Sequence, residues 1–253
     1  MSKTRLSPIK SLYVIGDIHG MLPQLEVILK RILPLRKADQ IVFLGDYIDR
    51  GNFSFEVIER LIKLQNDYPE QCIFLMGNHE FVFYNAIQPE SLFDNYKIWM
   101  NNGGYETLTS YMGNSKIKDL DPWCVTRNRI IQLVPASHLD FINNLLPYYE
   151  TDSCIFVHAG CDPYIALEDQ DFNFFIYDRS LCKNLINNKA KQNWEKIIIA
   201  GHNGQYKKGP FISNKFWMID GSRNETVYLF DAYNNDIYYA AEKNNKRLVK
   251  FKV

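Results

Sequence analysis

Five short apolar runs recur along the chain, and each is followed at once by a cluster containing Asp, Asn or His. The runs are rich in Ile, Val and Phe and span residues 11–15, 40–44, 72–76, 153–157 and 196–200. Runs of this length and composition predict buried β-strands. Because the carboxyl ends of parallel strands share the edge at which open α/β sheets bind ligands, we expect the polar clusters to lie together.

Two segments with helical periodicity separate the first three runs. Residues 22–33 and residues 53–65 each carry apolar side chains on one helical face. Ser54 is predicted to be the N-cap of the second helix. The order strand, helix, strand, helix, strand predicts parallel pairing with right-handed crossovers, and therefore an α/β fold.

The rest of the chain follows two other patterns. Residues 81–150 are rich in aromatic side chains and contain helical stretches, which predicts a small, mostly helical cap inserted between the third and fourth strands. After residue 201, strand-like runs alternate with Asn, Gly and Asp. These runs, at residues 216–220, 226–232, 236–242 and 247–253, predict a second, largely antiparallel sheet.

Composition narrows the class of protein. The 253 residues are 46% hydrophobic, which is enough for the core of one large domain. Lys plus Arg and Asp plus Glu both total 29, so no net charge favours nucleic acid or an anionic membrane as a partner. No apolar run is long enough to span a membrane, and the N-terminal segment has no signal-peptide core.

The cysteines indicate a reducing compartment. They are odd in number and contain no C-x-x-C pair, which favours free thiols over a disulfide framework. The five are Cys72, Cys124, Cys154, Cys161 and Cys182. We therefore expect a cytoplasmic protein, and export into an equally reducing host cytosol stays open.

The polar clusters offer ligands for metal ions. Their carboxylate, imidazole and amide donors suit divalent cations such as Mn²⁺, Fe²⁺ and Zn²⁺. The six donors are Asp17, His19, Asp46, Asn78, His158 and His202. Six donors are too many for one catalytic ion with open positions, whereas two ions roughly 3.5–4 Å apart, sharing Asp46, would use all of them. His138 has no such context and is predicted to be a solvated helix residue.

The motifs "GDIHG", "GDYIDRG", "GNHE", "HAG" and "GH", in this order, resemble those of the calcineurin-like metallophosphoesterases. Within that superfamily the chain is similar to the phosphoprotein phosphatase group, especially the compact bacterial and phage Ser/Thr protein phosphatases. The resemblance covers about Ser11 to Ala241. It implies a single metallophosphoesterase domain over residues 1–253, in which two packed mixed β-sheets are flanked by helices and carry the helical cap at about 81–150.

The resemblance also implies roles for individual residues. Asp17, His19 and Asp46 would hold one divalent ion, and Asp46, Asn78, His158 and His202 would hold the other. His79 would be the general acid and Asp49 would orient it. Arg50 and Arg179 would bind the phosphate. The implied enzyme hydrolyses phosphorylated proteins or peptides, at serine and threonine or with dual specificity, by means of a metal-bound hydroxide.

Two alternatives stay open. The symmetrical dinucleoside tetraphosphate hydrolases share "GDIHG" and "GNH", but they typically have alanine in place of Asp49 and aspartate in place of Glu80. A catalytically dead scaffold that binds phosphorylated partners would have a broken ligand set, whereas this chain has every ligand. The chain departs from the group at Met76, where many members have arginine, and in "GHN", where bacterial relatives have "GHT". The segment "NNGGYETLTSY" resembles a stretch of bacterial members, and we assign it no role beyond shaping the cap.

Overall fold

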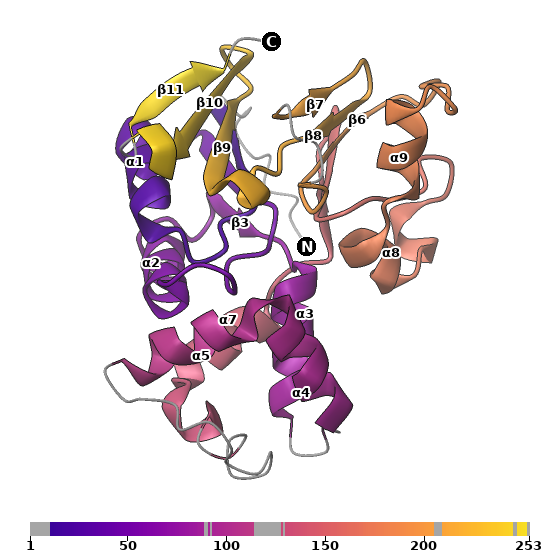
Figure 1. The fold of residues 1–253 in the computed structure, drawn as a ribbon. Helices are drawn as coiled ribbons and strands as arrows, with labels where there is room; N and C mark the ends of the chain where they lie inside the picture. Colours follow the sequence, from indigo (N-terminus) through magenta and orange to yellow (C-terminus); the bar gives the residue numbers. More distant parts are fainter. Residues whose placement is uncertain are drawn as a thin grey trace, which may run out of the picture.

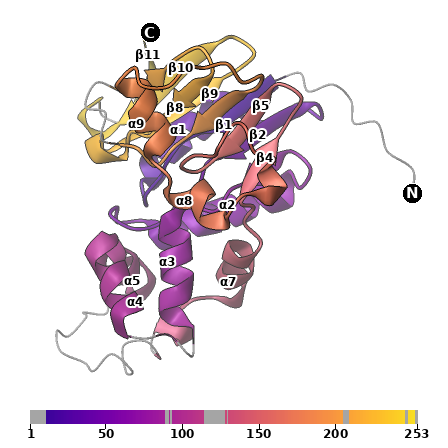
Figure 2. The same ribbon diagram turned by 90° about the vertical axis from the view of Figure 1, so that its right-hand side faces the viewer.

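The computed structural model describes residues 11–88, 91, 93–113, 128, 130–204, 209–244 and 247–251. Its strands form two mixed sheets that pack against each other, with helices on their outer sides and a helical part below them (Figures 1 and 2). Cys124, for which the sequence predicts a free thiol, lies outside the described residues. The other cysteines are all free.

The first sheet has six strands in the order β11-β10-β9-β1-β2-β3. Their bounds are β1 Ser11–Ile15, β2 Asp39–Phe43, β3 Cys72–Phe74, β9 Thr226–Asp231, β10 Asp236–Ala241 and β11 Leu248–Phe251. The predicted parallel pairing of β1, β2 and β3 is confirmed. The prediction that the C-terminal runs build a separate antiparallel sheet is wrong, because β9 pairs antiparallel with β1 and thereby extends the first sheet.

The second sheet has five strands in the order β4-β5-β6-β8-β7. Their bounds are β4 Tyr148–Glu150, β5 Cys154–Val157, β6 Ile197–Ala200, β7 Phe211–Ile212 and β8 Phe216–Met218. The strands β5, β6 and β8 are parallel, and β4 and β7 are antiparallel edges. The five apolar runs of the sequence therefore divide between two sheets, three in the first and two in the second.

The alternating directions of side chains along the strands explain how the two sheets and the outer helices pack in layers. Val14 and Val42 belong to a buried cluster that also contains Phe156 and Ile199 of the second sheet, so these side chains fill the space between the sheets. Their chain neighbours point to the opposite face, because successive side chains of a strand alternate. There Ile41 and its neighbours join the main core with α1 (Leu22–Ile32) and α2 (Ser54–Asp67).

The helices α1 and α2 correspond to the two predicted amphipathic segments. The N-cap of α2 is Phe53 rather than the predicted Ser54. Ser54 is the first helical residue, and its buried hydroxyl accepts a hydrogen bond from the backbone N–H of Asp49. The side chain thus binds the loop that leads into the helix instead of capping its own helix.

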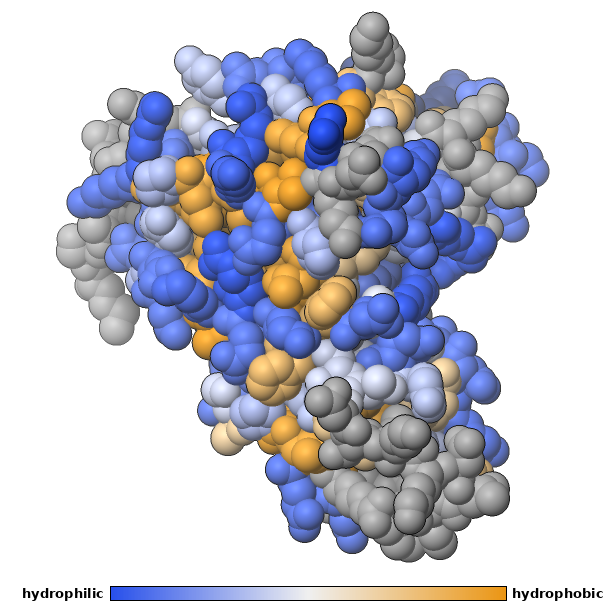
Figure 3. Space-filling model, turned by 60° about the vertical axis from the view of Figure 1, so that its left-hand side comes forward, coloured by the Kyte–Doolittle hydropathy of each residue, from blue (hydrophilic) through white to orange (hydrophobic). Residues whose placement is uncertain are grey.

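The helical part contains α3 (Asn78–Ile87), α4 (Phe93–Trp99), α5 (Tyr105–Met112) and α7 (Ala136–Asn143). Between α4 and α5 the segment Met100–Gly104 bends at Gly103. Helices α8 (Phe172–Tyr177) and α9 (Ser180–Ile186) lie beside the second sheet. Hydrophilic residues predominate on the face shown in Figure 3, where the helical part is narrower than the body above it. In the described ranges we find no helix that has both the length and the apolar character needed to cross a membrane.

Candidate active site

The polar clusters that follow β1, β2, β3, β5 and β6 meet in one buried place. Two groups of side chains there have nitrogen and oxygen atoms within 4.8 Å of one another, and Asp46 belongs to both groups. The first group adds His19 and His79, and the second adds His158 and His202. The side chains come from both sheets, so the site lies where the two sheets meet.

The backbone of this site is unusual. Among the described residues, eight that are not glycine have positive φ, and five of them are His19, Asp46, Asp49, Arg50 and His202. A positive φ is rare outside glycine because the side chain crowds the backbone. Such strain persists only where the surrounding structure enforces it, and it concentrates at functional sites.

Glu80 is one of the groups that enforce this backbone. Its buried carboxyl group accepts hydrogen bonds from the backbone N–H groups of Asp46, Tyr47, Ile48 and Gly77, at 2.7–3.2 Å. Burial, followed by the charge of Asp46, raises the pKa of Glu80 to about 7. No structural role was predicted for Glu80 from the sequence, although its place beside His79 in "GNHE" was a signal.

The loops after β2 and β3 touch through their glycines. A Cβ atom on Gly77 would lie 2.2 Å from the backbone nitrogen of Asp46. Gly45 has a φ of 101°, and a Cβ there would lie 2.6 Å from the nitrogen of Gly77. The absence of side chains at these two positions brings Asp46 next to Asn78 and His79.

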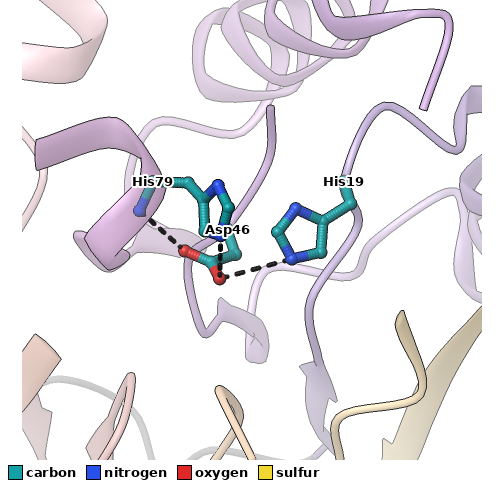
Figure 4. A group of neighbouring side chains, drawn as sticks. All are labelled: His19, Asp46 and His79. Carbon is teal, nitrogen blue, oxygen red and sulfur yellow. Dashed lines mark hydrogen bonds and ion pairs between the residues drawn. The ribbon is translucent and has the colours of Figure 1, made fainter. Parts of the chain in front are cut away.

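The first group surrounds one face of Asp46 (Figure 4). Nε2 of His19 lies 3.3 Å from Oδ2 of Asp46 and 3.9 Å from Oδ2 of Asp17. Nε2 of His79 lies 3.8 Å from Oδ2 of Asp46, and the backbone N–H of His79 donates to Oδ1. Asp17, His19 and Asp46 therefore lie together, as the sequence predicts.

The second group surrounds the other carboxylate oxygen. Nε2 of His158 lies 3.3 Å from Oδ1 of Asp46, 3.2 Å from Oδ1 of Asn78 and 3.2 Å from Nδ1 of His202. The backbone N–H of His202 donates to the carboxylate of Asp17, which links this group to the first. All six predicted metal ligands thus converge.

The histidines of both sheets are oriented for ligation. Nδ1 of His19 hydrogen-bonds the carbonyl oxygen of Ile48 at 2.7 Å, and Nδ1 of His158 hydrogen-bonds that of Leu44 at 2.8 Å. A carbonyl partner keeps the proton on Nδ1, which directs the Nε2 lone pair toward Asp46. Two imidazoles held in this way by a carbonyl oxygen, together with carboxylate and amide oxygens, are a donor set that suits divalent cations such as Mn²⁺, Fe²⁺ or Zn²⁺.

The pKa shifts of the buried acids and histidines also favour a divalent cation at this site. Burial, together with the charges of Asp220 and Asp46, raises the pKa of Asp17 well above its usual value. Burial would also raise the pKa of Asp46, but His158 and His79 lower it well below the usual range. Burial lowers the pKa of His158, but the charge and hydrogen bond of Asp46, together with the charge of Asp17, outweigh burial and raise this pKa to about 9. A cation is thus favoured beside Asp46, and a metal ion bound there would displace a proton from His158.

His79 is tied to Asp49 on the side away from Asp46. Its Nδ1 lies 2.7 Å from Oδ2 of Asp49, and both side chains are buried. Burial lowers the pKa of His79, but Asp46 and Asp49 outweigh burial and raise it. Nε2 of His79 accepts a hydrogen bond from Arg50 at 2.9 Å, and the same guanidinium donates to Nε2 of His19. In this conformation Arg50 competes with a metal ion for the lone pair of His19.

Arg179 also reaches the site. Its Nε donates to Nε2 of His202 at 2.9 Å. Burial, followed by the charge of His158, lowers the pKa of His202 to about 2. The predicted phosphate-binding residues Arg50 and Arg179 thus both lie beside histidines of the candidate metal groups. A groove of about 650 Å³ opens next to Arg50 and includes Ser222 and Arg223 in its lining.

Asp220 is a buried acid that the sequence analysis missed. Its carboxyl group raises the pKa of Asp17, after burial, and accepts a hydrogen bond from the backbone N–H of Ser222 on the rim of the groove. The signal was present, because the apolar run at residues 216–219 is followed by Asp and Gly like the runs that carry the metal ligands.

The prediction for His138 is wrong. Its side chain is fully buried, with Nδ1 2.7 Å from the hydroxyl of Tyr111 and Nε2 2.6 Å from Glu59. No apolar run precedes this histidine in the sequence, so nothing near it in the chain indicated burial. Its polar partners come from α5 and α2, which are distant in the chain. His138 therefore joins helices, and it contributes nothing to the site.

Comparison with known proteins finds a matching family model and several similar curated proteins. The model of the calcineurin-like phosphoesterase family matches residues 10–221. The serine/threonine-protein phosphatase PP2A-like PPG1 of Saccharomyces cerevisiae is 30% identical over 158 residues, which cover 62% of this chain and 34% of that protein. The chain spans about a third or less of the length of the curated relatives that it matches.

Solved structures share the fold. A putative diadenosine tetraphosphatase has a TM-score of 0.61 at 15% identity, with 92% of this chain and 95% of that chain covered. A serine/threonine phosphatase from Saccharomyces cerevisiae has a TM-score of 0.58 at 16% identity, with 98% and 82% covered. At this identity both structures support the fold alone. Since the family model matches most of the chain and the described fold agrees with it, the chain belongs to the calcineurin-like phosphoesterase family.

Proposed function

We propose that this chain is a metal-dependent phosphoprotein phosphatase that hydrolyses phosphoserine and phosphothreonine. The observation that carries the proposal is the buried Asp49–His79 pair, 2.7 Å apart, beside two groups of metal-binding side chains. Such a pair orients a proton donor toward the reacting centre. The similarity to one yeast serine/threonine-protein phosphatase over 62% of the chain supports this substrate class.

Two divalent cations would be held by the six converging ligands. Asp17, His19 and Asp46 would hold one ion, and Asp46, Asn78, His158 and His202 would hold the other. When bound, such a pair supplies Lewis-acid polarisation of the phosphoryl oxygens and a water activated near neutral pH. Mn²⁺ is the ion we expect to support activity in vitro, and Fe and Zn fit the same donors.

The arginines would bind the phosphoryl group. A guanidinium presents parallel N–H donors that match two phosphoryl oxygens. In the structure Arg50 donates to His19 and His79, and Arg179 donates to His202. Binding of metal and substrate therefore requires both guanidinium groups to turn from imidazole nitrogens to phosphate oxygens. The groove beside Arg50 would receive the peptide that carries the phosphate.

His79 would protonate the leaving alkoxide from Nε2. Once Arg50 has turned to the phosphate, this nitrogen is available for a proton, and the hydrogen bond of Nδ1 to Asp49 fixes the ring. A serine or threonine alkoxide is strongly basic and needs this proton, whereas the nucleotide phosphate that leaves a dinucleoside polyphosphate does not. The acid therefore favours phosphoester substrates.

Side-by-side kinetics with saturating Mn²⁺ test the proposal. We expect kcat/KM for phosphoserine and phosphothreonine peptides to exceed that for diadenosine tetraphosphate. A strong preference for the dinucleotide would overturn the assignment to protein substrates. Retained activity in protein shown by elemental analysis to be free of metal would overturn the two-metal site.

The acid is tested by His79→Asn. We expect kcat to fall by roughly 10²-fold or more on phosphopeptides and by less on aryl phosphates, whose leaving groups are weak bases. Metal content should stay near two ions per chain. If the variant loses a metal ion, His79 is a ligand, as its membership in the first group would also allow. His138→Gln removes a histidine outside the site and is the matched control.

A further inference from the structure

Three groups of the segment Trp99–Thr107 contact the Asp49–Arg50 loop, and we call this segment the cradle. The indole N–H of Trp99 donates to Oδ1 of Asp49 at 3.0 Å. The hydroxyl of Thr107 donates to the same oxygen at 2.7 Å. The carbonyl oxygen of Gly103 accepts from the backbone N–H of Arg50 at 3.2 Å. The cradle overlaps the stretch "NNGGYETLTSY", to which the sequence analysis gave no role at the site.

The bend of the cradle brings these groups together. Trp99 ends α4 and Thr107 lies in the first turn of α5, with the bend at Gly103 between them. Gly103 has a φ of 102°, and a Cβ there would lie 2.7 Å from the backbone nitrogen of Arg50. A Cβ on Gly104 would lie 2.7 Å from the ring of Trp99. The two glycines therefore let the bend fit between the ring and the loop.

The hydrogen bonds of Asp49 are divided between its two oxygens. Oδ1 accepts from Trp99 and Thr107, and Oδ2 faces Nδ1 of His79. Thr107 also accepts from the backbone N–H of Asp49, at 2.8 Å. All four side chains are at most 1% exposed, so water does not compete for these bonds. The orientation of the carboxylate is thus set from the helical part.

We propose that Trp99 and Thr107 are positioning residues for the acid, which hold Asp49 so that Oδ2 faces His79. The inference rests on the proposed function of the Asp49–His79 pair. Among the described residues we find no hydrogen bond from either side chain to the six candidate metal ligands, and each acts through Asp49. Without the two donors the carboxylate of Asp49 is free to rotate about its Cβ–Cγ bond. The imidazole of His79 then loses its fixed orientation. Transfer of the proton to the leaving group then becomes slower.

The variants Trp99→Phe and Thr107→Val remove one donor each while keeping most of the packed volume. We expect kcat on an alkyl phosphate monoester to fall by roughly 10–100-fold, by analogy with the loss when hydrogen-bond partners of metal ligands are removed. With 2,4-dinitrophenyl phosphate, whose leaving group needs no proton, we expect little change. Metal content should stay at two ions per chain, and Thr107→Ser should restore most of the activity.

Tyr111→Phe is the matched control. It lies in α5 like Thr107 and also removes a hydroxyl from a hydrogen bond, but this partly buried hydroxyl contacts His138 rather than Asp49. We expect this variant to keep the wild-type ratio of alkyl to dinitrophenyl rates. An equal loss on both substrates in Trp99→Phe and Thr107→Val, or the same ratio change in Tyr111→Phe, would overturn the positioning role.

A second measurement does not depend on activity. In protein with ¹⁵N-labelled histidine, the proton on Nδ1 of His79 should give a downfield NMR resonance that is protected from exchange. We expect this resonance to shift and broaden in Trp99→Phe and Thr107→Val and to stay in place in Tyr111→Phe. An unchanged resonance in the first two variants would refute the positioning role. A wild-type preference for dinucleotides, with the resonance shifted as expected, would refute only the proposed substrate.

Discussion

At the scale of single residues, the site depends on side chains that hold strained backbone. Asp46 and Asp49 have φ values of 54° and 70°, which their own side chains disfavour. Glu80 compensates by accepting the backbone N–H groups of the loop at 46–48. One carboxyl group thus satisfies three successive backbone donors of the loop, while the backbone N–H of Asp49 is held by Ser54 and Thr107.

Glu80→Gln should therefore destabilise the protein. A neutral amide offers a single oxygen to these donors and turns its own NH₂ group toward them. We expect the free energy of unfolding near pH 5 to fall by about 1–3 kcal/mol, the range for leaving buried donors without an acceptor. The measurement is made there because at pH 8 the raised pKa of Glu80 already costs the wild type stability. Urea unfolding with a chelator present measures this without a contribution from metal binding.

Glu26→Gln is the control for this substitution. Glu26 pairs with Arg60 at 2.7 Å, but its side chain is 47% exposed. A surface ion pair contributes at most about 1 kcal/mol, so this variant should unfold nearly like the wild type. Equal losses in the two variants would contradict the role assigned to Glu80.

At the scale of elements, His138 connects three helices. It lies in α7, its Nδ1 meets the hydroxyl of Tyr111 in α5, and its Nε2 meets Glu59 in α2. Burial lowers the pKa of His138, and the hydrogen bond to Glu59 only partly offsets this. The neutral imidazole donates from Nε2 to Glu59 and accepts from Tyr111, so every polar atom of the ring has a partner. A second proton, on Nδ1, would displace the Tyr111 hydroxyl.

This arrangement predicts a loss of stability in mild acid. The pKa of His138 is lower in the folded chain than its usual 6.5, so below pH 6.5 the unfolded chain binds more protons. The contribution is fully present above pH 6.5 and is lost as the pH falls toward the folded pKa. One proton changes the free energy of unfolding by at most about 1.4 kcal/mol per pH unit.

Comparison with His138→Gln isolates this contribution. The free energy of unfolding, measured in urea between pH 5 and 8 with a chelator, should fall more steeply below pH 6.5 in the wild type than in the variant. The other histidines titrate in both proteins and cancel in the difference. Parallel curves would mean that His138 does not control the packing of α7 on α2 and α5.

At the scale of the whole molecule, the candidate metal site joins two sheets. His19, Asp46 and Asn78 follow strands of the first sheet, and His158 and His202 follow strands of the second. Metal ions bound by all of these residues would hold the two sheets together. A ligand that binds only the folded state stabilises it in proportion to the logarithm of its concentration over Kd.

Metal removal should therefore lower the melting temperature as well as the activity. At free Mn²⁺ about 100 times Kd, each bound ion adds about 2.7 kcal/mol to the free energy of unfolding. We expect calorimetry to show a rise in Tm when Mn²⁺ is added to chelated protein. Asp46→Asn should lose this rise because both sites share Asp46, whereas His138→Gln should keep it. A rise preserved in Asp46→Asn would contradict a shared ligand.

The sequence by itself determined most of the strands, the first two helices and the set of candidate metal ligands. Alternating apolar residues fix which face of a strand is buried, and helical spacing fixes α1 and α2, since both depend on residues close in the chain. The motifs after the strands placed all six donors, together with Asp49, His79 and Arg50, because these residues lie in the short turns that the strands orient. Local signals were sufficient for each of these.

Only the tertiary structure decided how the elements were combined. The β9–β11 strands joined β1 rather than forming their own sheet, because any exposed strand edge offers the same hydrogen-bonding groups and local sequence does not choose among edges. Trp99 and Thr107 lie 50 and 58 residues from Asp49 in the chain, and His138 lies 79 residues from Glu59. A buried polar group needs a partner, but its own sequence context does not say which distant element supplies it.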